Sequence, residues 1–204
     1  MDQARRIGLT GGIATGKSTV GRLLAERHGI TVVDADQLAR AALAPGTEAT
    51  LAVLQRYGRA VQAADGSPSL DRPALARIVF ADPVERQWLE ELVHPLVRAA
   101  FQAELEGLKA EPVVVLMIPL LYEAGLESLC TEIWVVECGS EEEQLQRLQG
   151  RDGLTREAAL ARLRAQWPMA KKLARANLVL SNVGSPSELA ASVEQALART
   201  PPGS

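Results

Sequence analysis

Short apolar runs alternate with longer helical patterns over most of the chain. The runs lie at 7–10, 31–33, 113–118, 133–137 and 178–180, and none shows the polar alternation of a half-solvated strand. Strands that are apolar throughout are typical of a parallel sheet covered by helices on both faces. The pattern therefore predicts an α/β fold in which these five runs form a parallel sheet.

The helical segments carry readable start signals. Ser140 with Glu143 forms a capping box, and Ser185 with Glu188 forms a second one with Pro186 at the first helical position. Residues 38–107 hold helical patterns without a convincing strand, so they are predicted to be an insertion. Residues 144–172 are polar and rich in arginine, which indicates a mobile helical cover outside the core.

Composition and charge narrow the class of protein. A chain of 204 residues with 47% hydrophobic residues can bury the core of one globular unit. A net charge of −3 gives no support to a protein that coats nucleic acid. The longest apolar stretch, 113–122, is about half of what a membrane span requires, and no export signal is evident. We expect a cytoplasmic protein without nucleic-acid or membrane partners; its oligomeric state is not indicated.

Residues 11–18 read GGIATGKS, a complete G-x-x-x-x-G-K-S phosphate-binding loop between an apolar run and a helical pattern. Glycines let successive backbone N–H groups turn toward phosphate oxygens, and the helix that follows adds its positive dipole end. Lys17 is expected to place its ammonium against the outer phosphates, and Ser18 to offer a hydroxyl to Mg²⁺. The motif predicts a nucleotide site.

Asp34 follows the apolar run 31–33 directly. Because ligands bind at the carboxyl ends of parallel strands, Asp34 is expected near the phosphate loop. A transferase needs a group there that orients an attacking hydroxyl and accepts its proton. Asp34 or Asp36 could instead cap the following helix, and both roles are compatible.

No carboxylate closes the apolar run 113–118, and the first acid after it is Glu123. Mg²⁺ is therefore expected on Ser18 and phosphates, with Asp34 or Asp36 contacting it directly or through water. No Asp-x-x-Gly and no Asn-Lys-x-Asp occurs in the chain, which argues against a guanine-specific switch protein.

Two arginines are candidates for contacts to phosphate. Arg147 and Arg151 lie four apart on one expected helix, so they share a face and could offset charge during transfer. Each could instead be a surface residue paired with an acid such as Glu143. Lys171 and Lys172 are interpreted as a solvated helix face. His94 is interpreted as a local hydrogen-bonding residue and His28 as a partner of a helix dipole.

These motifs, in this order, resemble the dephospho-coenzyme A kinase family over residues 7–184. The matching residues are Leu9–Ile13, Gly16–Thr19, Asp34–Asp36, His94–Leu96, Pro119–Glu123, Gln144–Arg147, Arg151–Asp152, Gln166 and Asn182. The resemblance implies a P-loop kinase with three α/β/α layers and a five-stranded parallel sheet. It implies a nucleotide-binding core of 1–37, 108–141 and 173–204, an acceptor-binding insertion of 38–107, and a lid of 142–172.

The resemblance also implies the reaction and its residues. ATP, with Mg²⁺, would phosphorylate the ribose 3′-hydroxyl of dephospho-coenzyme A in the last step of coenzyme A biosynthesis. The implied catalytic residues are Lys17, Asp34 and Arg147, and Ser18 is the implied metal ligand. The implied nucleotide contacts are Gly12, Ile13, Ala14, Thr15, Gly16, Lys17, Ser18, Thr19, Arg151 and Asn182. The implied acceptor contacts are Thr10, Asp34, Leu38, Tyr57, His94 and Leu120.

The chain departs from the family at two positions. Many relatives carry an aspartate where Met117 stands, and an Ala-Asp pair where this chain has Ala176-Asn177. The first departure weakens a metal role for that strand, and the second is expected to alter a polar contact beside the adenine pocket. Two other functions stay open on the residues alone: another small-molecule kinase, such as a nucleoside monophosphate kinase, or an ATP-dependent binding module.

Overall fold

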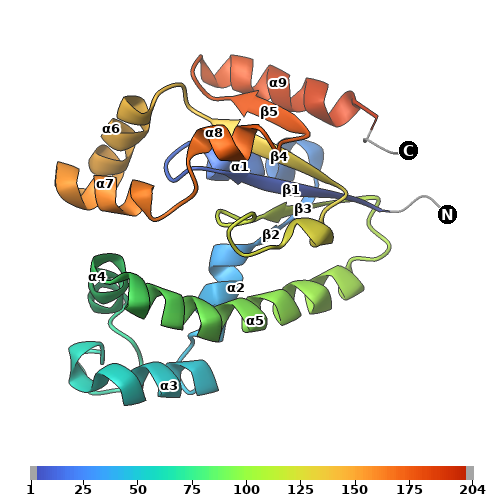
Figure 1. The fold of residues 1–204 in the computed structure, drawn as a ribbon. Coiled ribbons are helices and arrows are strands. Elements are labelled where there is room, and N and C mark those ends of the chain that lie inside the picture. The colour runs from blue at the N-terminus through green and yellow to red at the C-terminus, as the bar shows by residue number, and fades with distance from the viewer. Residues whose placement is uncertain (1–3, 201–204) are drawn as a thin grey trace. The chain divides into compact units, whose positions relative to one another are not determined.

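A parallel sheet of five strands in the order β2-β3-β1-β4-β5 organises the larger part of the chain (Figure 1). The structure is a computed structural model that describes residues 4–200. Its strands are β1 (Arg5–Gly11), β2 (Thr31–Asp34), β3 (Val113–Met117), β4 (Glu132–Glu137) and β5 (Leu178–Ser181). Each predicted strand is present, and the observed bounds differ from the predicted ones by two residues at most. The predicted α/β class with a five-stranded parallel sheet is therefore confirmed.

Helices α1 (Lys17–His28) and α9 (Pro186–Ala198) cover one face of this sheet. The core there joins apolar side chains of both helices to β1, β3, β4 and β5; its fully buried members include Leu9, Leu24, Val115, Trp134 and Val193. A core shared by four parallel strands fixes their register. The carboxyl ends of the strands therefore form one rigid edge, here called the carboxyl edge.

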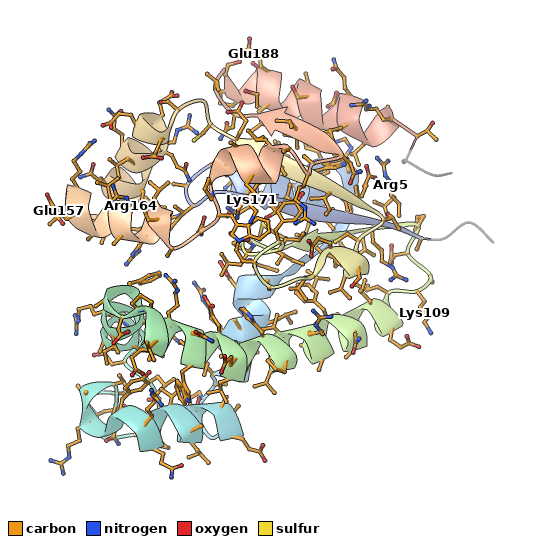
Figure 2. All side chains as sticks on the ribbon, in the orientation of Figure 1. Arg5, Lys109, Glu157, Arg164, Lys171 and Glu188 are labelled. Carbon is orange, nitrogen blue, oxygen red and sulfur yellow. The ribbon has the colours of Figure 1, made fainter. Side chains whose placement is uncertain are left out.

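The amino ends of the strands are held by a buried ion pair. The Nε of Arg5, labelled in Figure 2, lies 2.5 Å from Glu132 Oε1, and its other guanidinium nitrogens donate to carbonyls at the end of α9. Trp134 Nε1 donates to the second carboxylate oxygen of Glu132 at 2.9 Å. The pair ties β1, β4 and α9 together at the edge opposite the phosphate loop.

Helices α6 (Glu141–Asp152) and α7 (Arg156–Arg164) lie side by side beyond β4, followed by α8 (Met169–Leu173) (Figure 1). The predicted capping boxes at Ser140 and Ser185 are both present. Leu145, Leu148 and Ala159 form a small buried cluster between α6 and α7, against which Ile13 packs. The α6–α8 segment is therefore attached to the phosphate loop by apolar contacts as well as by the polar ones described below.

Residues 35–104 form a separate compact unit. It contains α2 (Ala35–Ala42), α3 (Glu48–Tyr57), the 3₁₀ turn η1 (Gly58–Ala60), α4 (Arg72–Ala81) and most of α5 (Pro83–Gly107). Val53, Val61, Leu75 and Val79 are the buried centre of its own core. As predicted, this stretch holds no strand; a single bridge pairs Gln62 with Leu70. The remaining described residues, with the 3₁₀ turn η2 (Glu127–Leu129), form the other unit.

None of the helices formed by residues 4–200 has both the length and the apolar character required to cross a bilayer.

Candidate phosphate-transfer site

The loop after β1 contains backbone φ angles that few types of residue adopt. Gly11 has φ +148°, Ala14 has φ +60° and Gly16 has φ +105°. A Cβ on Gly16 would lie 2.1 Å from Asn182 Nδ2, so this position requires glycine for space as well as for conformation. Ala14 has no such freedom, and a non-glycine residue in the left-handed region persists only where its surroundings hold it.

The carbonyl groups of the loop are held by side chains. Lys17 Nζ donates to Gly11 O at 3.1 Å and to Gly12 O at 2.5 Å, and Thr15 Oγ1 donates to Gly12 O at 3.0 Å. Two further donors come from distant segments: Gln144 Nε2 lies 2.6 Å from Ile13 O, and Asn182 Nδ2 lies 2.9 Å from Thr15 O. These bonds keep the carbonyls occupied, while the first N–H groups of α1 lack partners within the helix. The result is an anion-binding helix terminus with an ammonium beside it.

Two backbone amides of the loop are bonded to side chains just after α7. Ile13 N donates to Gln166 Oε1 at 2.9 Å, and Gly12 N donates to Met169 Sδ at 3.1 Å. The chain that links α7 to α8 therefore rests directly on the loop. Gln166 belongs to the motif set on which the resemblance was drawn, but Met169 carried no sequence signal.

Asp34 ends β2 at the carboxyl edge. The register aligns Asp34 with Met117, and Met117 with Leu9, so β3 separates Asp34 from the strand that leads into the loop. Two strand spacings correspond to about 10 Å. The carboxyl ends of β2 and β1 therefore lie about that far apart. Asp34 is partly exposed, and Ser18 is exposed in the first turn of α1.

The two candidate arginines lie in different surroundings. Arg147 is half-buried, and its Nη2 donates at 3.0 Å to the backbone carbonyl of Asn182, the residue whose side chain holds Thr15 O. Arg151 is exposed and makes a two-point ion pair with Asp152, which also binds Arg162. Arg151 lowers the pKa of the Asp152 carboxyl by donating to it. Surface pairing is thus observed for Arg151, with Asp152 as its partner, whereas Arg147 contacts the segment that supports the loop.

The interpretation of Lys172 as part of a solvated face is wrong. Lys172 is 0% exposed, and its Nζ donates to Glu123 Oε1 at 2.8 Å and to Pro119 O at 3.1 Å. Glu123 also accepts from Trp167 N at 2.8 Å. The neighbouring Lys171 is exposed, with its Nζ 3.2 Å from the centre of the Trp167 ring. Adjacent lysines on a short helix point to different sides, and one of them anchors α8 to the chain after β3.

Both end residues of the segment 144–172, Gln144 and Lys172, are buried, so the expected cover is attached to the core at both ends. Thr10, an expected acceptor contact, is also buried and donates to Pro119 O at 3.2 Å. Leu120 follows that proline and is partly buried.

The departure at Asn177 lies elsewhere than expected. Asn177 Oδ1 accepts from Ile133 N at 2.7 Å, and Asn177 N donates to Ile133 O. Asn177 therefore joins the amino ends of β4 and β5, on the side of the sheet opposite the carboxyl edge. The prediction that Asn177 lies beside the adenine pocket was wrong, because that pocket is expected next to the phosphate loop. Met117 packs against the core under α1, with its sulfur 3.2 Å from a Cβ built on Gly21.

Three expected acceptor residues, Leu38, Tyr57 and His94, belong to the unit 35–104. Tyr57 donates its hydroxyl to Glu85 at 2.5 Å, and Arg56 pairs with the same carboxylate. Donation from Arg56, then from Tyr57, lowers the pKa of Glu85 to about 2. Burial, then the bond to Glu85, raises the pKa of the Tyr57 phenol. Tyr57 thus has a structural partner within its own unit, and the acceptor role of these three residues stays a prediction.

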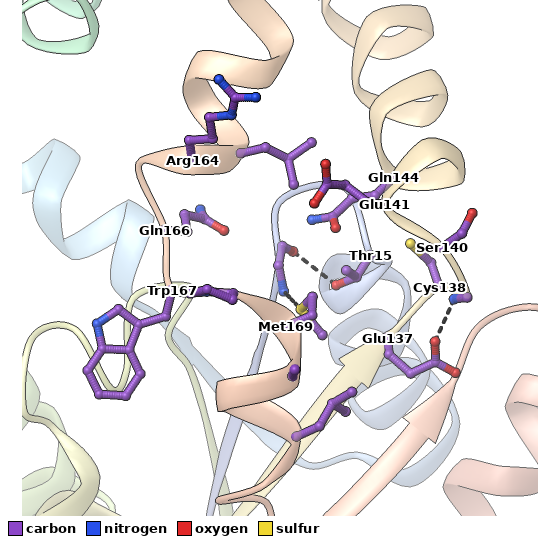
Figure 3. Close-up of a pocket in the computed structure, with 16 residues that line it drawn as sticks. Thr15, Glu137, Cys138, Ser140, Glu141, Gln144, Arg164, Gln166, Trp167 and Met169 are labelled. Atoms are coloured by element: carbon purple, nitrogen blue, oxygen red, sulfur yellow. Dashed lines mark hydrogen bonds between the residues drawn. The ribbon is translucent and has the colours of Figure 1, made fainter.

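A cavity of about 450 Å³ lies between the loop, the end of β4, the start of α6 and the chain around α8 (Figure 3). Gly12, Thr15, Cys138, Gln144 and Gln166 are among its lining residues. Figure 3 shows the indole of Trp167 turned away from the other labelled side chains. Burial raises the pKa of the Cys138 thiol, and the positive charge of Arg147 partly offsets this rise.

No group of three or more His, Cys, Asp or Glu residues able to hold a metal occurs among residues 4–200. Ser18 offers an exposed hydroxyl at the loop. This donor set fits Mg²⁺, an ion that keeps several waters and binds through few protein ligands and substrate phosphates. It does not fit a cation that needs several protein side chains as ligands.

Comparisons with known proteins agree on one family. A family model described as Dephospho-CoA kinase matches residues 5–188. The Dephospho-CoA kinase of Parasynechococcus marenigrum (strain WH8102) is 58% identical over 191 residues, which cover 94% of each chain. The solved structure of TT1252 from Thermus thermophilus superposes with a TM-score of 0.77 and 41% identity, covering 97% of this chain and 98% of that one. Dephospho-CoA kinase from Campylobacter jejuni gives a TM-score of 0.69 and 27% identity, covering 94% of both.

The anchor at Lys172 yields a prediction about stability. Replacing Lys172 by Met leaves the Glu123 carboxylate without its cation, and breaking a buried pair in this way costs about 3 kcal/mol. We expect Lys172→Met to lower the free energy of unfolding in urea by about that amount. Lys171→Met, the matched control, removes only an exposed contact with Trp167 and should cost about 1 kcal/mol or less.

A double variant distinguishes the cost of leaving the Glu123 carboxylate unpaired from the cost of changed packing at Lys172. Adding Glu123→Gln to Lys172→Met removes the uncompensated charge and should recover part of the lost stability. Equal stability of the Lys171 and Lys172 variants would contradict the anchoring role.

Proposed function

The chain belongs to the dephospho-CoA kinase family, and we propose that it transfers the γ-phosphate of ATP to the ribose 3′-hydroxyl of dephospho-coenzyme A. The products are ADP and coenzyme A, so the reaction is the final step of coenzyme A biosynthesis. The observation that carries the proposal is the family match over residues 5–188, which includes the complete phosphate loop. We place the reaction in the cytoplasm with small molecules as its partners.

In this proposal the phosphates of ATP lie against the loop and the start of α1. The amides of Gly16, Lys17 and Ser18 face the phosphates at the positive end of the helix, and the Lys17 ammonium reaches the outer ones. Lys17 already lies within hydrogen-bond distance of Gly11 O and Gly12 O, so its side chain is folded along the loop. Ser18 would hold Mg²⁺, which neutralises charge on the phosphates.

Asp34 is proposed to orient the acceptor hydroxyl. The hydroxyl oxygen forms a bond to the γ-phosphorus as the bond from that phosphorus to the β–γ bridging oxygen breaks, and the hydroxyl proton passes to the Asp34 carboxylate. The bridging oxygen leaves with ADP. The position of Asp34 at the carboxyl edge, with β3 between it and the loop strand, supports this role.

Arg147 is proposed to offset the charge that develops on the transferred group, and its contact with Asn182 keeps it next to the loop. The other proposed nucleotide contacts are Arg151 and Asn182. Leu38, Tyr57, His94, Thr10 and Leu120 remain proposed acceptor contacts. The insertion 38–107 and the lid 142–172 remain proposals for the parts that bind the acceptor and cover the nucleotide.

The choice of acceptor is tested directly. With ATP labelled at the γ-phosphate and with Mg²⁺, dephospho-coenzyme A should be consumed at least about 100-fold faster than AMP, CMP or shikimate, because only the matching acceptor presents its hydroxyl in line. The label should appear on the product ribose. Equal turnover of any of the other three acceptors would reject this substrate.

Asp34→Asn keeps the shape of the side chain but removes the proton acceptor. We expect kcat to fall about 10²- to 10⁴-fold, while the affinity for ATP, measured by calorimetry, changes less than about threefold. Asp36→Asn distinguishes the neighbouring carboxylate and should leave most of the activity. Unchanged kcat in Asp34→Asn would remove this residue from the reaction.

Arg147→Ala should lower kcat about 10³-fold, as expected for loss of an arginine that stabilises phosphoryl transfer. One hydrogen bond to Asn182 O is lost, so stability should fall by about 1 kcal/mol. Arg156→Ala is the control, because Arg156 is an exposed arginine of α7 that pairs with Glu142. A lowered melting temperature with normal kcat would indicate a structural role for Arg147.

A further inference from the structure

The backbone N–H and C=O of Ile13, which belong to the two peptide groups on either side of its Cα, are held from both ends of the segment between β4 and α8. Gln144, in the first turns of α6, donates to Ile13 O at 2.6 Å. Gln166, after α7, accepts from Ile13 N at 2.9 Å. The backbone fixes the roles of the two side chains: a carbonyl only accepts, so Gln144 presents its NH₂, and an N–H only donates, so Gln166 presents its oxygen.

The backbone position of Ile13 matters because the next residue, Ala14, has a strained backbone conformation. Ala14 has φ +60°, which an alanine does not adopt without support. Ile13 and Ala14 pack against the buried cluster of α6 and α7, and Gln144 is 3% exposed. Losing the Gln144 donor would leave Ile13 O without this partner at a partly buried position, which costs part of the desolvation penalty of a carbonyl.

Ile13 also directly follows the two residues whose carbonyls Lys17 contacts. Lys17 Nζ, which reaches the outer phosphates in loops of this kind, contacts the carbonyls of Gly11 and Gly12, directly before Ile13. The amides at the start of α1 lie on the other side of Ala14. Fixing the backbone of Ile13 therefore helps to hold the part of the loop that Lys17 contacts and the strained Ala14 that follows it.

We propose that Gln144 and Gln166 are positioning residues for phosphate transfer, which together clamp the backbone of Ile13 on both sides of its Cα and so maintain the loop geometry that the reaction requires. This inference rests on the proposed function. The clamp also ties both ends of the proposed lid to the loop, since Gln144 and Gln166 lie near the first and last residues of 142–172.

The test uses the different roles of the two amides. Gln144→Ala and Gln166→Ala should each lower kcat about tenfold, equivalent to one hydrogen bond that is lost in the transition state, with KM for ATP changed less than about threefold. Gln166→Glu keeps an acceptor oxygen and should restore kcat at saturating ATP. Gln144→Glu replaces the donor by a carboxylate facing Ile13 O and should not restore it. Gln146→Ala, on an exposed position of α6, is the matched control and should behave as the parent.

A measurement without substrate accompanies the kinetics. Amide hydrogen exchange of the peptide that spans residues 11–18, followed by mass spectrometry in the ligand-free protein, should be faster in both alanine variants, slow in Gln166→Glu and unchanged in Gln146→Ala. Unchanged kcat and unchanged exchange in the alanine variants would overturn the proposal. Faster exchange over the whole sheet with normal kcat would also overturn it, because the glutamines would then be only structural.

The exchange measurement also separates the two proposals. If the parent protein fails to phosphorylate dephospho-coenzyme A while exchange follows the expected pattern, the proposed function fails and the clamp stands.

Discussion

The phosphate loop depends on hydrogen bonds to its own carbonyl groups from side chains far away in the sequence. Gln144 and Asn182 donate to Ile13 O and Thr15 O on either side of Ala14, whose φ is +60°. A backbone in this conformation stores strain that other contacts must offset. The anion-binding geometry is therefore a property of the folded unit, because the eight motif residues do not supply these contacts themselves.

The sheet provides the rigid frame on which those contacts are built. Its core under α1 and α9 fixes the register, and the ion pair of Arg5 with Glu132 closes the amino edge. Three parts of the site lie at the carboxyl ends of strands of this one sheet. They are the phosphate loop after β1, Asp34 at the end of β2, and the supporting chain after β5. Preorganised donors of this kind need no rearrangement when charge develops, which is the larger part of catalysis in phosphoryl transfer.

The strands and helix starts were predictable because their signals are local. Apolar runs without alternation marked the buried strands, and Ser140 with Glu143 marked a cap. The surroundings of Lys172 and Asn177 were not predictable, because their partners are a carboxylate and backbone groups distant in sequence. Lys171 and Lys172 are identical in type and adjacent, so no pattern separates the exposed one from the buried one. The loop could be predicted as a motif, but the identity of its supports could not.

The carboxylates near the carboxyl edge differ in how far their charge is compensated. Glu123 is paired with Lys172, and Glu137 accepts the backbone N–H of Gly139. Met117 ends β3 without a charge. An uncompensated carboxylate repels an anion, and the buried lysine compensates the charge of Glu123. Met117 likewise adds no repulsion, and its thioether is not an oxygen ligand of the kind that Mg²⁺ prefers. The absence of a carboxylate at Met117 therefore does not affect the proposed role of Asp34 as a proton acceptor, because Asp34 ends the neighbouring strand.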